Sequence, residues 1–104
     1  FMPRPRRRRR IRGNPNATYF KPSGIPKCEL EIVPLAMDEF EAIRLKDFQE
    51  LNQKTAAQKM NISQPTFHRL LNSAHKKISD AIINGKAIEI INIHTRIKKT
   101  LPRP

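Results

Sequence analysis

The sequence predicts a mainly α-helical domain in which the last two of three helices form a helix-turn-helix, with a small two-stranded β element and basic, disordered ends. Three observations favour this class: apolar residues recur at helical spacing between residues 36 and 84, two short stretches have strand character, and Arg and Lys are concentrated at both ends. At 104 residues the chain forms one small domain. We divide it into a basic arm (1–17), a helix-turn-helix domain with flanking strands (18–93) and a basic tail (94–104).

The stretch Leu51–Asn84 predicts a short helix, a tight turn and a longer helix. Asn52 is placed to cap the short helix with its side-chain oxygen, and Leu51 before it can pack back onto Ala56. The apolar residues of this helix recur at helical spacing, at Ala56, Ala57 and Met60. Asn61 follows the helix, and because Asn tolerates positive φ, the chain can reverse there without a glycine.

The longer helix is predicted to begin after Ser63, whose hydroxyl can cap it, and to end at Asn84-Gly85. Pro65 lies in its first turn, where a missing N–H costs nothing. Its apolar face consists of Phe67, Leu70, Leu71, Ala74, Ile78, Ala81 and Ile82. Its polar face has no acid before Asp80 and consists of Gln64, Thr66, His68, Arg69, Asn72, Ser73, His75, Lys76 and Lys77.

This polar face is typical of a recognition helix, whose side chains meet base edges in the major groove of DNA. Contacts with bases or adjacent phosphates are expected from Gln64, Thr66, His68, Arg69, Asn72 and Ser73. Contacts with phosphates are expected from Lys54, Lys59, Lys76 and Lys77. The alternative is an ordinary helical hairpin whose polar face is only solvated, and the absence of acids argues against it.

The N-terminal arm has almost no apolar content and is expected to be disordered alone. Its seven arginines are Arg4, Arg6, Arg7, Arg8, Arg9, Arg10 and Arg12. We expect them to lie along phosphates or to enter a minor groove. A solubilising tail and a basic localisation signal are the alternatives.

The net charge of +12 indicates a polyanionic partner, and its distribution indicates an orientation. Residues 28–51 hold seven acids against two bases, whereas residues 52–79 hold five bases and no acid. The long helix and the ends are therefore expected to face the polyanion, with the first helix turned away from it.

The first helix is predicted over Ala36–Phe48. Its inner stripe consists of Met37, Phe40, Ile43 and Phe48. Three acids in its first turns, Asp38, Glu39 and Glu41, are interpreted as favourable partners of the helix dipole.

Two strands are predicted, Lys27–Val33, which Pro34 ends, and Ala87–Ile93. The alternation of the first strand places Cys28, Leu30 and Ile32 on its buried face, with Cys28 as a small hydrophobe. We expect the two strands to pair with each other, the alternative being pairing with another chain.

Upstream of these strands, Tyr19 and Phe20 lie in a turn-rich stretch. They could stack on a base, but covering the small core is the preferred interpretation.

No catalytic constellation, metal site or cofactor site is expected. His68 and His75 are seven residues apart, too far for the i, i+4 spacing of paired ligands, and the single cysteine excludes a disulfide within the chain and sulfur-rich zinc sites. No apolar run approaches the length of a membrane span. These features predict a cytoplasmic, nucleoid-associated protein that does not bind membranes and is not an enzyme.

Several segments together resemble a known family, domain of unknown function 134. They are MPRPR (2–6), TYFKPSGIP (18–26), DEFEAIRLKDFQEL (38–51), AAQKMNISQPTFHRLLNSAHKKI (56–78) and NGKAIEI (84–90). The resemblance implies DNA binding through a helix-turn-helix similar to region four of bacterial sigma factors. The chain departs from the family pattern at Ala36, where a capping Thr or Ser is usual, and at Thr55, where Glu is usual.

The leading hypothesis is a sequence-specific protein that binds double-stranded DNA and regulates transcription. One alternative is an RNA-binding protein, because Arg-rich arms also fold on RNA. Another is an adaptor that binds a protein of the transcription apparatus. Pairing with a second copy of the chain would stabilise so small a core.

Overall fold

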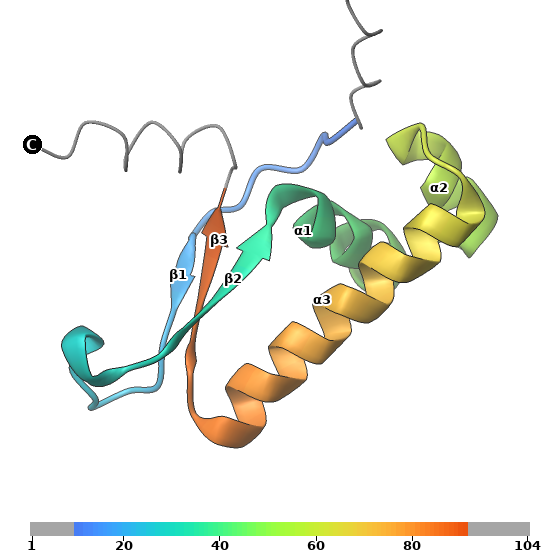
Figure 1. The fold of residues 1–104 in the computed structure, drawn as a ribbon. Coiled ribbons are helices and arrows are strands. Elements are labelled where there is room, and N and C mark those ends of the chain that lie inside the picture. The colour runs from blue at the N-terminus through green and yellow to red at the C-terminus, as the bar shows by residue number, and fades with distance from the viewer. Residues whose placement is uncertain (1–9, 92–104) are drawn as a thin grey trace, which may run out of the picture.

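The computed structural model describes residues 10–91 and shows a mainly helical protein with a small sheet (Figure 1). The helices are α1 (Met37–Ile43), its continuation as the π-helical turn η2 (Arg44–Phe48), α2 (Gln53–Met60) and α3 (Gln64–Asn84). The long helix α3 extends from the turn after α2 to the turn that leads into the sheet (Figure 1). Its first half packs against α1 and α2, and its second half packs against the sheet.

The sheet has three strands, one more than predicted, in the order β1-β3-β2. The central strand β3 (Ala87–Ile91) confirms the predicted strand as far as Ile91, and the last two residues of the prediction lie outside the described range. Strand β2 (Ile32–Ala36) runs parallel to β3, with Ile32 opposite Ala87. Strand β1 (Tyr19–Phe20) runs antiparallel to it, with Tyr19 opposite Glu89. The aromatic pair is thus part of the sheet, with Tyr19 partly buried and Phe20 half exposed.

Two clusters of buried side chains form the core. The helical cluster lies among α1, η2, α2 and α3 and consists of Ala42, Leu45, Ala56, Ala57, Met60, Phe67 and Leu71. The sheet cluster lies between the sheet and the helices α1 and α3 and consists of Leu35, Ala74 and Ile90, with Met37, Phe40, Ile43 and Ile88 packed against it. Three of the four residues predicted for the inner stripe of the first helix are therefore confirmed.

The predicted strand Lys27–Val33 is wrong in position and in its buried face. Residues Lys27–Glu29 form a 3-10 turn, η1, and Cys28 is exposed rather than buried. The strand begins at Ile32 and buries Val33 and Leu35, the opposite set from the one predicted, because a shift of one residue exchanges the two faces of a strand. Pro34 does not end the strand, since β2 is an edge strand and can accommodate a residue without an N–H.

Two apolar residues assigned to packing faces are exposed instead. Phe48 is 81 % exposed because η2 is a π-helical turn, closed by Gln49 N–H bonding to the carbonyl of Arg44, and the wider turn moves later residues off the α-helical register. Leu45 takes the buried position in η2. Ile82 is 74 % exposed, like its neighbour Ile83, because the buried face of α3 passes through Ala81 in this last turn.

Candidate nucleic-acid interface

The turn between α2 and α3 has the local structure that its residues favour. Asn52 caps α2, its Oδ1 accepting from the Thr55 N–H at 2.8 Å. Asn61 ends α2 in the left-handed region with φ 60°. Ser63 caps α3, its Oγ accepting from the Thr66 N–H at 3.3 Å, and Pro65 follows in the first turn. All of these features were predicted from the residue types.

The inner side of α3 fixes which side chains it exposes. Phe67 and Ala74 are fully buried, and Leu71 is nearly so. The polar residues that precede Phe67 and those that lie between Phe67 and Ala74 consequently lie on the other side of the first half of the helix. We name this surface the α3 polar face, and it consists of Gln64, Thr66, His68, Arg69 and Asn72.

Hydrogen bonds connect neighbours along the α3 polar face. Asn72 Nδ2 and His68 Nε2 are 3.1 Å apart, and the Arg69 guanidinium donates to Thr66 Oγ1 at 3.4 Å. Apart from Thr66, which is partly buried, these side chains are exposed. Arg69 and His68 therefore offer their remaining donors and acceptors to solvent or to a ligand.

Three residues grouped with this face in the sequence have partners inside the protein. Ser73 Oγ and Lys77 Nζ both donate to the buried carboxylate of Glu39 in α1, the latter at 2.8 Å. His75 Nε2 lies 2.6 Å from Asp47 Oδ2. Ser73 and Lys77 thus hold α3 against α1 in this structure, and the α3 polar face ends at Asn72.

Glu39 is a structural residue as well as an acid at a helix start. It is 5 % exposed, and its Oε1 also accepts from the Ala36 N–H at 2.9 Å, which forms one half of a capping box, while the alanine side chain cannot form the other half. Burial opposes ionisation of Glu39, but the hydrogen bonds from Lys77, Ser73 and Ala36 outweigh it and hold the pKa of this carboxyl below its usual value. Interpreting Glu39 only as a partner of the helix dipole missed these contacts.

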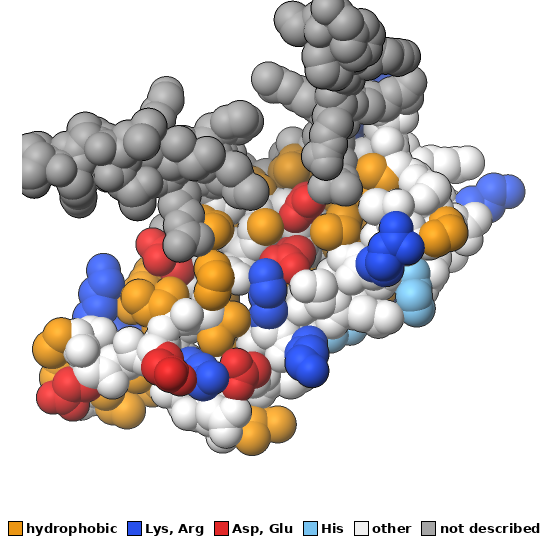
Figure 2. Space-filling view, viewed as in Figure 1, with side chains coloured by type: hydrophobic (Ala, Val, Ile, Leu, Met, Phe, Trp, Pro, Cys, Tyr) orange, Lys and Arg blue, Asp and Glu red, His pale blue; other side chains and the backbone are white. Residues whose placement is uncertain are grey.

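The remaining predicted cationic residues that the structure describes are exposed, on α2, on α3 and in the arm. Lys54 and Lys59 on α2 and Lys76 on α3 are exposed. Figure 2 shows that, over α2 and the first half of α3, the charged side chains on the visible face are Lys, Arg or His. Of the arm, Arg10 and Arg12 are described and exposed, whereas Arg4, Arg6, Arg7, Arg8 and Arg9 lie outside the described residues.

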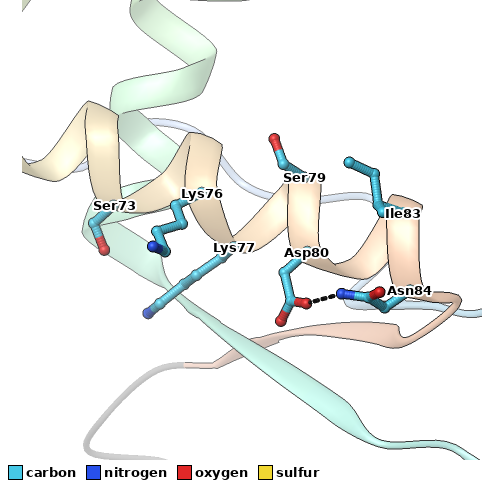
Figure 3. A pocket seen from close by; sticks show the side chains of 7 residues that line it. All are labelled: Ser73, Lys76, Lys77, Ser79, Asp80, Ile83 and Asn84. Carbon is cyan, nitrogen blue, oxygen red and sulfur yellow. Dashed lines mark hydrogen bonds between the residues drawn. The ribbon is translucent and has the colours of Figure 1, made fainter.

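The second half of α3 has a different character. Its exposed side carries an open hollow (Figure 3), lined by Ser73, Lys76, Lys77, Ser79, Asp80, Ile83 and Asn84. Asp80 accepts from Asn84 Nδ2 at 2.7 Å and from Lys86 Nζ at 3.0 Å, and these bonds lower the pKa of the Asp80 carboxyl. This region combines an acid and an exposed isoleucine with the lysines, so it is a poorer surface for a polyanion than the α3 polar face.

The part of the arm that the structure describes is held against the domain. The backbone N–H groups of Arg12 and Gly13 donate to the buried carboxylate of Glu41, and the N–H of Arg10 donates to the carbonyl of Met60. From the sequence, residues 1–17 are expected to be disordered on their own. The contacts above show that residues 10–13 are instead held against the domain. The i, i+3 spacing of Glu41 and Arg44 was visible in the sequence, but the approach of Gly13 from far along the chain was not.

Over residues 10–91, no three His, Cys, Asp or Glu side chains are grouped in a way that could hold a metal ion. Within the same range, no helix has the length and apolar character needed to cross a membrane.

Comparison with known proteins identifies the family that this chain resembles. Residues 2–96 match the family described as "Protein of unknown function DUF134". A UPF0251 protein of Caldanaerobacter subterraneus is 54 % identical over 89 residues, which cover 86 % of this chain and 75 % of the relative. A UPF0251 protein of Moorella thermoacetica is also 54 % identical over 89 residues, covering 86 % of this chain and 60 % of its own length. A third, from Clostridium botulinum, is 48 % identical over 97 residues, covering 93 % and 62 %.

No solved structure matches the chain significantly. The family match spans most of the sequence and the relatives are identical to it at about half of the aligned positions, so this chain belongs to the DUF134 family of proteins of unknown function.

Proposed function

We propose that this protein is a non-catalytic, sequence-specific double-stranded DNA-binding protein that regulates transcription. The observation that carries the proposal is the α3 polar face, which starts directly after a tight, doubly capped turn and has no acidic residue. In a helix-turn-helix protein, residues at the start of the second helix contact base edges while the first helix crosses the backbone.

The residue types of the α3 polar face suit this task. Arg69 can donate two hydrogen bonds to the O6 and N7 of guanine, and Gln64 or Asn72 can bond in the same bidentate way to adenine. Lys54 and Lys59 on α2, together with Lys76, are at exposed positions suited to phosphates, which fix orientation without specifying sequence. Ser73 and Lys77 are assigned a smaller part, because their contacts with Glu39 would have to be exchanged for contacts with DNA.

The test is a selection from a random duplex library with the purified full chain, followed by measurement of affinity for the enriched duplex, a scrambled duplex of equal length and a structured RNA. We expect one enriched motif, bound about 10³-fold or more tightly than the scrambled duplex. Preference for the structured RNA would replace this proposal with RNA binding. Failure to bind any nucleic acid at low salt would overturn the proposal.

A further inference from the structure

The segment through which the N-terminal arm joins the domain, which we call its root, contacts one carboxylate whose acceptor positions are all used in hydrogen bonds. Glu41 is 1 % exposed, and its two oxygens accept from four donors. The Arg12 N–H and the Gly13 N–H donate at 3.1 Å each, and the Arg44 Nε and Nη2 donate at 2.8 Å each. A carboxylate has about four acceptor positions, so the arm supplies half of the partners that make burial of this charge acceptable.

Gly13 allows this approach because it has no side chain. A Cβ at this position would lie 2.2 Å from Arg44 Nε, 2.3 Å from Arg44 Cδ and 2.8 Å from Glu41 Oε1. The guanidinium cannot move aside without giving up its paired bonds to Glu41. We call the four residues Arg12, Gly13, Glu41 and Arg44 the arm clasp.

Beyond the arm clasp the chain runs to the turn that precedes α3. The Arg10 N–H donates to the carbonyl of Met60 at 3.1 Å, and Met60 is the last residue of α2. Residues 10–17 thus pass from β1 along α1 to the end of α2 (Figure 1). Arg10, the first residue of the arm that the structure describes, therefore lies next to the α2–α3 turn, close to the start of the α3 polar face.

We propose that the arm clasp is a positioning site that holds the root of the Arg-rich arm beside the α2–α3 turn, so that the arm and α3 engage the same stretch of duplex DNA. This inference rests on the proposed function. Without the clasp, residues 10–17 would be a flexible linker with an end-to-end distance of about 15 Å and no fixed direction. The effective concentration of the arm at phosphates near α3 would then fall.

The test combines Gly13→Ala with removal of residues 1–9, which carry five arginines and leave the clasp residues in place. Affinity for one enriched duplex is measured over a range of salt concentrations for the four resulting proteins. Removing residues 1–9 should flatten the salt slope by about 2–4 units. In the full chain, Gly13→Ala should weaken binding about tenfold, whereas in the shortened chain it should change affinity less than twofold. Asn16→Ala, an exposed change in the same segment, is the matched control and should have no effect on either chain.

A second measurement reports on the clasp without DNA. Amide exchange of Arg12 and Gly13 should be slow in the wild-type chain and fast at these two positions in Gly13→Ala, with a cooperative thermal transition retained. Equal effects of Gly13→Ala on the full and shortened chains, or no effect on either, would overturn the positioning role and leave DNA binding by α3 standing. Absence of duplex binding by the wild-type chain would overturn both proposals.

Discussion

The helical half and the sheet half of this molecule are encoded differently in the sequence. The structure from α2 to α3 depends on interactions between residues that are close in the sequence. Examples are the cap at Asn52, the left-handed conformation of Asn61 and the cap at Ser63. The sheet depends on pairing of β3 with β2 and with β1, whose residues lie more than 50 positions away along the chain. The difference teaches that a capped turn can be recognised from residue types, whereas strand register is decided by distant partners.

Two buried acids in α1 bind other segments of the molecule. Glu39 receives hydrogen bonds from α3, and Glu41 receives them from the arm and from Arg44. Both lie on a helix that also contributes side chains to each core cluster. The first helix is therefore the connection between the half that the sequence predicts well and the half that it predicts poorly.

The largest expected effect tests the helical half. Phe67 is fully buried in the helical cluster, and Phe67→Ala should lower the free energy of unfolding by about 3–5 kcal/mol, measured by urea denaturation. For a domain of this size such a loss approaches the whole stability. Ile82→Ala, at a side chain that is 74 % exposed, is the control and should change stability by less than about 0.5 kcal/mol. Similar losses in both variants would mean that the packing face of α3 is wrongly assigned.

The next effect tests the buried carboxylate of Glu41 in α1. Glu41→Gln replaces one acceptor oxygen by a donor that faces the donors of Arg12 or Arg44. Because the partly buried guanidinium of Arg44 or a backbone N–H would lose its partner, and Glu41 itself is buried, the free energy of unfolding should fall by about 2–4 kcal/mol. Glu29→Gln, at an exposed acid, should leave it nearly unchanged. A Glu41→Gln protein as stable as the wild type would show that the carboxylate is dispensable.

The same carboxylates predict loss of stability in acid. Burial alone would raise the pKa of Glu41, but hydrogen bonds from Arg44, Arg12 and Gly13 outweigh it and lower the pKa in the folded state, as hydrogen bonds do for Glu39. A group with a lowered folded pKa stabilises the fold above its unfolded pKa, about 4.3 for Glu, and that stabilisation disappears as the pH falls through the folded value. Denaturation curves between pH 7 and 3 should therefore show a decline below about pH 4.5. The decline should be shallower in Glu41→Gln, and equal slopes would contradict the assignment.

The smallest expected effect tests whether the residue at position 61 determines the stability of the α2–α3 turn. Asn61 has φ 60°, a conformation that asparagine adopts more readily than alanine because its short polar side chain can hydrogen-bond locally, so Asn61→Ala should lower stability by about 1 kcal/mol. Asn61→Gly should be tolerated better than Asn61→Ala, since glycine adopts this conformation readily. Thermal melts of the two variants provide the measurement. If alanine were as well tolerated as glycine, the turn would not depend on the residue at position 61.

The sequence alone predicts those parts of the fold in which a local residue pattern indicates a single structure. The boundaries of α2 and α3 follow from caps and from the two asparagines and the glycine that end them. The π-helical turn η2 was not predictable from apolar spacing, and Phe48 was misassigned as a result. Alternation over Lys27–Val33 predicted burial of Cys28, Leu30 and Ile32, whereas the strand that pairs with β3 buries Val33 and Leu35.

For the candidate site, sequence identified the exposed residue types but not which of them were already engaged. Gln64, His68, Arg69 and Asn72 are exposed where the helical period places them. Ser73 and Lys77 share that period, yet Glu39 binds both, because α1 packs along this side of α3. The arm clasp depends on contacts between residues about 28 positions apart, which no local pattern indicates.

The most direct test of DNA binding by α3 is the affinity of Arg69→Ala for the enriched duplex and for a scrambled duplex. Arg69 is the only arginine from residue 52 to residue 84, and its guanidinium is exposed. We expect the substitution to weaken binding to the enriched duplex by about 1–3 kcal/mol and to the scrambled duplex by much less. Lys76→Ala, at an exposed cation further along α3, should weaken both by similar, smaller amounts. Unchanged affinity of Arg69→Ala for the enriched duplex would contradict the account.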